Sequence, residues 1–242
     1  MKIITSNNIS LMFVFIFSVL HVEVMALVNN ESVVSDTTLD DSSYRKSWYF
    51  DAYLDDDIIG YHTFDMYEKN GETIIKSEAV FNVNFLFITV YSYLHNNIEI
   101  WSNNCLKKLN STTDDNGNPL SVKLFKEDGN IYIETEGFRV KKKSCVRSFA
   151  YWDSELIKSN SLLNSQTGEL IDISFRHLGE ESYELNNKLI ETERYQLRGS
   201  DRHGKEIEID LWYASGTQWV ALRSKLDNGN TLRYQLNMGV AQ

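Results

Sequence analysis

The stretch "EIEIDLWY", residues 206–213, alternates strictly between two kinds of position. Its two sets of side chains are Ile207, Ile209, Leu211 and Tyr213 on one side, and Glu206, Glu208, Asp210 and Trp212 on the other. Successive side chains of a strand point to opposite faces of the sheet. The pattern therefore predicts a β-strand with one buried face and one hydrated face.

Two-residue alternation recurs along the chain from Trp48 onward. Its longest example is "TIIKSEAVFNVNFLFITVYSYLH", residues 73–95, which predicts one very long strand or two strands joined by a bend. Turn signals separate such stretches, the first being the Asn-Gly pair in "KNGE" at residues 69–72. Only one proline, Pro119, is present, which suits continuous strand pairing.

These features predict an all-β fold with minor short helices. We expect about eleven to thirteen antiparallel strands, because turn signals recur every ~8–12 residues and no long segment has helical periodicity. An open sheet of that size tends to curl, so the expected architecture is a large curved sheet or an incomplete β-barrel with a short helical or looped segment at its mouth. The expected single domain is 47–242, after a flexible, polar arm at 27–46.

The N-terminus has the layout of a secretory signal peptide over residues 1–26. Lys2 precedes an unbroken apolar run at 11–20, and Val24 and Ala26 occupy the small-residue positions of a cleavage site. A membrane anchor is the competing interpretation, but that run is shorter than the ~20 apolar residues that a spanning helix needs. We expect an exported protein, periplasmic or extracellular, with no transmembrane anchor after cleavage.

Charge and cysteine content restrict the partners and the compartment. The net charge of −10 argues against a nucleic-acid partner, because a phosphate backbone selects a basic surface. The two cysteines, Cys105 and Cys145, are expected to pair in an exported chain, with two separate thiols as the alternative. No metal site is expected, since the chain has no CxxC motif and its Asp-Asn-Gly stretches lack the ligand spacing of a calcium loop.

Residues 150–170, "AYWDSELIKSNSLLNSQTGEL", break the alternation. Tyr151, Trp152 and Asp153 stand side by side, ahead of the apolar pair Leu162–Leu163. We expect residues 149–164 to pack across the concave face of the sheet, with Trp152 turned inward. This segment is either a plug that completes the core or the lid of a ligand cavity.

Several of these motifs together resemble a known group of proteins. "GYHTF", "YSYLHNNIEIW", "FAYWD", "LLNSQTGEL" and "LWY", in this order, resemble a family of exported bacterial proteins of uncharacterised function. The resemblance covers roughly residues 48–236. Its architecture is similar to the lipoprotein-localisation-factor fold, a curved antiparallel sheet around an apolar cavity. The resemblance implies an envelope location and a hydrophobic ligand, and it implies no catalytic residues.

Three residues are candidates for acid–base chemistry. If Asn96–Asn97 forms a tight turn, His95 and Glu99 face each other across a hairpin, where a carboxylate beside an imidazole builds an acid–base pair. A structural pair near a strand end is the alternative. Asp153 is either a carboxylate displayed at the barrel mouth or the N-cap of a short helix.

The favoured function is a binding or carrier module for an apolar or amphipathic ligand, such as a hydrophobic small molecule or lipid. An enzyme with an acid–base site at the barrel mouth and a structural or interaction protein of the envelope are the alternatives. No cofactor is expected, and we expect a monomer. His62 shares its parity with Phe64, so a hydrogen-bonded core histidine is the alternative to a ligand-binding one. The candidate ligand-binding residues are His62, Tyr93, Trp101, Tyr151 and Trp152.

Overall fold

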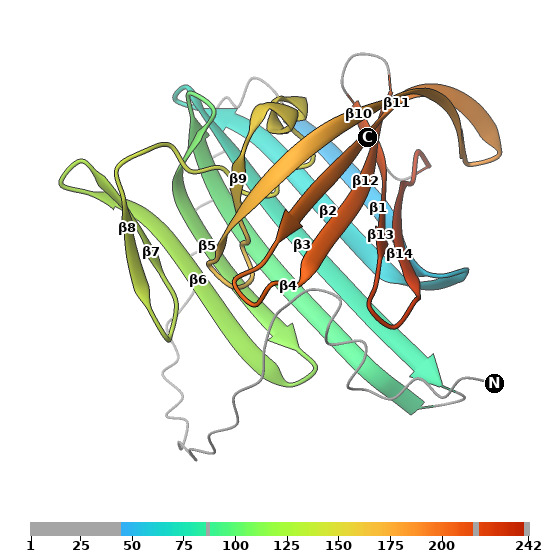
Figure 1. The fold of residues 1–242 in the computed structure, drawn as a ribbon, viewed down its shortest axis with the longest axis horizontal. Helices are drawn as coiled ribbons and strands as arrows, with labels where there is room; N and C mark the ends of the chain where they lie inside the picture. Colours follow the sequence, from blue (N-terminus) through green and yellow to red (C-terminus); the bar gives the residue numbers. More distant parts are fainter. Residues whose placement is uncertain (1–44, 86–87, 215–217, 240–242) are drawn as a thin grey trace, which may run out of the picture.

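The fold is one large antiparallel sheet. The computed structural model describes residues 45–85, 88–214 and 218–239, and within them fourteen strands form a curved sheet that does not close into a barrel (Figure 1). This confirms the predicted fold class, while the number of strands exceeds our estimate. The two halves of the sheet, blue to green and orange to red in Figure 1, curl toward each other.

The first half of the sheet is a meander of eight strands. They are β1 (Arg45–Leu54), β2 (Asp57–Lys69), β3 (Glu72–Phe85), β4 (Ile88–Ser102), β5 (Cys105–Asp115), β6 (Asn118–Glu127), β7 (Asn130–Glu134) and β8 (Arg139–Lys142). The chain then crosses the concave side through one short 3-10 helix, η3 (Ser154–Lys158).

The second half contains six strands. They are β9 (Ser161–Leu163), β10 (Leu170–Leu185), β11 (Lys188–Ser200), β12 (Glu206–Ala214), β13 (Gln218–Lys225) and β14 (Thr231–Leu236). Strand β14 pairs with β1, so the two halves form one continuous sheet whose edges are β8 and β9. The basic residues of β8 lie at an edge, where charged side chains discourage pairing with another chain.

Tight two-residue turns set the strand pairing. Both central residues have positive φ at each of five hairpins, the geometry whose backbone twist matches that of the flanking strands. Asparagine, aspartate and glycine tolerate this conformation better than other residues. The five pairs are Asn70–Gly71, Asn103–Asn104, Asn116–Gly117, Asp128–Gly129 and Asn186–Asn187.

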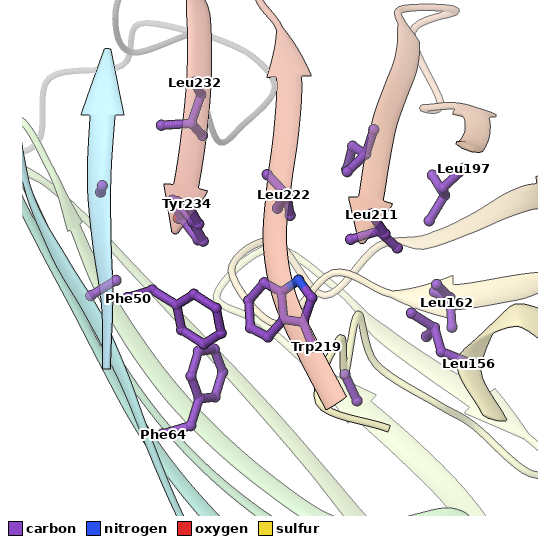
Figure 2. Close-up of a cluster of buried hydrophobic side chains, with 14 of the residues drawn as sticks. Phe50, Phe64, Leu156, Leu162, Leu197, Leu211, Trp219, Leu222, Leu232 and Tyr234 are labelled. Atoms are coloured by element: carbon purple, nitrogen blue, oxygen red, sulfur yellow. The ribbon is translucent and has the colours of Figure 1, made fainter. Parts of the chain in front are cut away.

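Aromatic side chains pack the junction between the two halves. Phe50 of β1 and Trp219 of β13 have ring centroids 4.0 Å apart, and Phe64 of β2 lies edge-on to Trp219 at 5.6 Å (Figure 2). Phe50 and Trp219 are almost completely buried. The contacts therefore join strands from opposite ends of the sequence into one core.

The hydrated face predicted for residues 206–213 is wrong for two of its residues. Asp210 and Trp212 are buried on the convex side, because side chains of neighbouring strands cover them. Arg194 of β11 and Arg223 of β13 donate to Asp210 Oδ2 at 2.8 and 2.7 Å. Both guanidinium groups also lie over the Trp212 ring.

The structure can be compared with three further predictions about where segments begin and end. Residues 73–95 belong to two strands, β3 and β4, which corrects the single-strand alternative. Arg45 and Lys46, expected in the flexible arm, begin β1. The expected signal peptide and the rest of the arm lie outside the described residues. Among the described helices, none has the length and apolar character to cross a membrane.

Gly60 allows a close approach between two central strands. It has φ +154°, and a Cβ atom built there would lie 1.9 Å from the carbonyl oxygen of Val80 on β3. No side chain fits without moving the backbone of β3. Gly60 lies opposite Ala52, where the register of β1 and β2 shifts. This close approach is two residues from His62, so it helps to position the site described below.

Replacing Gly60 by alanine is expected to lower the free energy of unfolding by about 2–4 kcal/mol, because the added Cβ collides with backbone. Gly71→Ala is the matched control: its φ is also positive, but nothing lies within 4 Å of the added atom. The control should cost about 1 kcal/mol. Urea unfolding of both variants gives the comparison, and equal losses would contradict the collision.

Candidate functional site

A cavity of about 230 Å³ lies between the two halves of the sheet. Its surface has three parts, which we name by their residues. The polar floor on β2–β4 comprises His62, Ser77, His95, Asn97 and Glu99; the apolar wall on β12–β14 comprises Ile207, Ile209, Leu222, Leu232 and Tyr234; the cover segment is residues 148–166.

Strand register explains why the polar floor is hollow. Ala79 of β3 pairs with His62 on one side and with His95 on the other. In the next row, Ser77 lies between Phe64 and Asn97. Small side chains in the middle strand, flanked by larger ones, leave space above β3 that bulky residues would fill.

His95 is held by hydrogen bonds at both ring nitrogens. Its Nδ1 is 2.8 Å from Thr113 Oγ1 on β5, and its Nε2 is 3.4 Å from Ser165 Oγ of the cover segment. The imidazole is buried, and this burial lowers the pKa of His95 to about 4. His95 is therefore neutral at physiological pH and links the floor to the cover.

Glu99 is a buried carboxyl group with two donors from its own strand. Asn97 Nδ2 donates to its Oε1 at 3.0 Å, and Trp101 Nε1 donates to its Oε2 at 2.8 Å. Burial raises the pKa of Glu99, whereas these hydrogen bonds oppose that rise by favouring the carboxylate. Residues 97, 99 and 101 share one face of β4, which brings all three groups together.

His62 differs from His95 because neither of its ring nitrogens has a hydrogen-bond partner. Its ring lies 4.1 Å from that of Phe64. Burial, together with the neighbouring His95, lowers the pKa of His62 to about 3, so the ring is neutral. Further buried polar atoms without a partner occur in other residues that line the cavity, among them Asn97 Oδ1 and Gln166 Nε2.

The cover segment is anchored at several points. The Cys105–Cys145 disulfide, expected from the sequence, ties the chain just before it to the start of β5. The backbone N–H of Leu163 donates to the carbonyl of Arg147 at 2.7 Å. Tyr213 Oη donates to the carbonyl of Tyr151 at 2.9 Å. These bonds hold the segment over the concave side of the sheet.

The predicted ligand-binding residues largely surround the cavity. His62, Tyr93, Tyr151 and Trp152 line it. Trp101 does not line it, but its ring meets that of Trp152 edge-on at 5.6 Å and it donates to Glu99. Trp101 therefore supports the site from behind.

The three acid–base candidates do not converge. His95 and Glu99 both line the cavity, but the condition of a tight turn at Asn96–Asn97 is not met, because β4 continues through these residues. The two side chains project from the same face of one strand, four residues apart. Asp153 is outside the lining: it caps η3 by accepting from the Glu155 N–H and pairs with Arg147.

Sequence reasoning missed Asn97, Gln166 and the small residues of β3. Asn97 shares the parity of His95 and Glu99, so the alternation could have placed it in the floor once the turn assignment was dropped. Nothing in the local sequence marks Gln166. Within the described ranges, no cluster of three or more His, Cys, Asp and Glu side chains could hold a metal ion.

A family model for a domain of unknown function, DUF6134, matches residues 50–237. The chain belongs to this family. The match extends from β1 to just beyond β14, so the DUF6134 domain contains the whole sheet, the cavity and the cover segment.

The solved structures that resemble this DUF6134 chain include one with the same fold. It is a β-barrel-like protein of a domain of unknown function, DUF1849, from Brucella abortus, with 8% identity and a TM-score of 0.58 over 80% of this chain and 94% of that one. A DUF1329 family protein from Desulfovibrio piger matches with 10% identity and a TM-score of 0.19 over 80% of this chain and 83% of that one. No curated protein matches the sequence.

Removing the disulfide with Cys105→Ser and Cys145→Ser together is expected to lower the free energy of unfolding by about 4 kcal/mol. The bridge spans a sequence separation of 40 residues, and losing it frees the unfolded chain. Urea unfolding of the oxidised protein and of the double variant measures the difference. A loss well below 1 kcal/mol would show that the bridge does not hold the cover segment in place.

Lowering the pH from 6 to 4 is expected to destabilise the DUF6134 domain through its buried histidines. Their pKa values lie below the ordinary value of 6.5, so over most of this range the unfolded state takes up protons while the folded state does not; His95, with a pKa of about 4, begins to be protonated in the folded state at the lower end. This stabilisation is complete above pH 6.5 and is lost as the pH falls. Each histidine contributes a slope of about 1.4 kcal/mol per pH unit.

His62→Phe isolates one of these contributions, because it keeps the ring and removes both nitrogens. The variant should lose stability less steeply than the wild type between pH 6 and 4, measured by urea unfolding at each pH. The contribution of Glu99 is common to both proteins and cancels in the difference. Identical slopes would mean that His62 is protonated in the folded state.

Proposed function

We propose that this protein is an exported binding or carrier module that holds an apolar or amphipathic small molecule or lipid in the cavity. The observation that carries the proposal is the cavity itself, with an apolar wall facing a polar floor. Sites for small molecules commonly combine wide apolar contact with a few polar groups that fix orientation. Leu222, Leu232 and Tyr234 offer such contact opposite His62 and His95.

The cover segment supports the lid interpretation over the plug. Tyr151 and Trp152 border the cavity without filling it. A plug would leave a packed interior, which would have favoured the structural or interaction hypothesis. The resemblance to the lipoprotein-localisation-factor fold also supports a hydrophobic ligand, and the disulfide supports an oxidising compartment outside the cytosol.

The enzyme hypothesis receives less support. Ser165 Oγ and His95 Nε2 are 3.4 Å apart, an arrangement that resembles a nucleophile and its base. The lowered pKa of His95 makes its imidazole a poor base at neutral pH, and Asp153 is engaged elsewhere. The cavity is therefore better suited to holding a molecule than to proton transfer.

Filling the cavity with Ala79→Leu is expected to weaken the binding of Nile red, an uncharged apolar dye, about tenfold or more. Ala79 lies between His62 and His95, so a larger side chain occupies the space above the floor. Fluorescence titration with the dye gives the dissociation constants. Lys76→Ala, on the exposed face of the same strand, is the control and should bind like the wild type.

Failure of the wild type to bind Nile red would contradict the proposed function. Equal affinities for the wild type and Ala79→Leu would place the dye outside the cavity.

A further inference from the structure

We propose that the cavity selects an amphipathic molecule whose buried head group is uncharged and both donates and accepts hydrogen bonds, as a hydroxyl or a carboxamide group does. This inference rests on the proposed binding function and names the chemical class of the ligand. Its basis is a set of buried polar atoms that have no partner within the protein and belong to residues that line the cavity.

The unpartnered atoms include both donors and acceptors. A neutral His62 has one ring N–H that donates and one ring nitrogen that accepts, and both nitrogens are unpartnered. Asn97 Oδ1 is an unpartnered acceptor, whereas the amide nitrogen of Asn97 already donates to Glu99. Gln166 Nε2 donates. A head group that satisfies this set must itself offer hydrogens as well as lone pairs.

Their placement around one cavity makes the set a site. His62 comes from β2, Asn97 from β4 and Gln166 from the cover segment, so residues from three separate parts of the chain line the same cavity. A buried polar atom without a partner costs roughly 1–3 kcal/mol of stability. Several such atoms around one cavity are consistent with a polar occupant that completes their hydrogen bonds.

The groups that face this space disfavour an ionised head group. His62 and His95 are neutral, because burial lowers the pKa of each, and Glu99 carries two donated hydrogen bonds. A carboxylate has no hydrogen to donate to Asn97 Oδ1 and would lie near Glu99. An ammonium has no lone pair for Gln166. Either ion would also lose its hydration without a buried counter-charge free to replace it.

Apart from Glu99, the charged residues of the lining lie on the other half of the sheet. Lys205, just before β12, pairs with Asp227, beyond β13, at 2.9 Å. Glu206, Glu208 and Lys225 lie on the same two strands. The polar floor, which contains His62 and Asn97, is on β2–β4. His62 and Asn97 thus lie on a different half of the sheet from these charged residues.

Three probes that share a ten-carbon tail test the inference: decanamide, decanoate and decylamine. Each is titrated at pH 7 against the oxidised full-length protein carrying Nile red, and displacement of the dye gives its affinity. We expect decanamide to bind at least tenfold more tightly than either ionised probe, the difference that one or two satisfied hydrogen bonds produce.

The variant His62→Phe links the preference to the floor. It should weaken decanamide binding about fivefold to tenfold more than it changes the affinity for Nile red, because only the amide depends on the hydrogen bonds of His62. Lys76→Ala, on the outer face, should change neither affinity. An unchanged affinity of His62→Phe for decanamide would remove His62 from the proposed site.

The outcomes separate this inference from the proposed function. Equal affinities for the three probes, tighter binding of decanoate or decylamine, or dye that decanamide cannot displace would overturn the head-group assignment while Nile red binding leaves the binding function standing. A wild type that does not bind the dye would end both.

Discussion

The pairing register of β2, β3 and β4 is the constraint on which the rest of this structure depends. It aligns Ala79 between His62 and His95, and Ser77 between Phe64 and Asn97. Because side chains alternate between faces, a slip of one residue would turn these groups to the convex side and fill the interior with the outward set. The tight turn at residues 70–71 and the close contact at Gly60 fix this register, and the hollow follows from it.

The hollow is stabilised from the opposite side by elements distant in sequence. Strand β14 pairs with β1 and brings Leu232 and Tyr234 over the polar floor, while Trp219 packs on Phe50. The disulfide and the hydrogen bonds of residues 148–166 hold the cover in place. The apolar core surrounds the cavity, and several of the buried polar atoms that lack a hydrogen-bond partner belong to residues that line it. Such an arrangement is typical of a site whose function opposes its own stability.

Sequence periodicity was sufficient for the fold class, because a half-buried strand requires alternation, and the Asn-Gly and Asp-Gly turns were recognisable. The positions of all the turns could not be predicted, because the same local sequence occurs both in a turn and within a strand. The pairs at 96–97 and 103–104 are both Asn-Asn, yet the chain turns only at the second. Asn97 instead donates to Glu99, two residues along the same strand. Trp212 was assigned to the hydrated face, since its cover comes from β11 and β13. Individual aromatic residues at the cavity could be predicted from the sequence. Which polar side chains lie beside them depends on the pairing register of β2, β3 and β4, which the sequence did not reveal.

Native mass spectrometry of the intact, oxidised protein purified from a lipid-rich expression host tests the central claim most directly. The account predicts a co-purified adduct that is extracted by organic solvent, is identified as an uncharged amphiphile, and is lost when a larger side chain occupies the space above β3. A clean mass of the unliganded chain under the same conditions, or an adduct that persists when the cavity is filled, would contradict it.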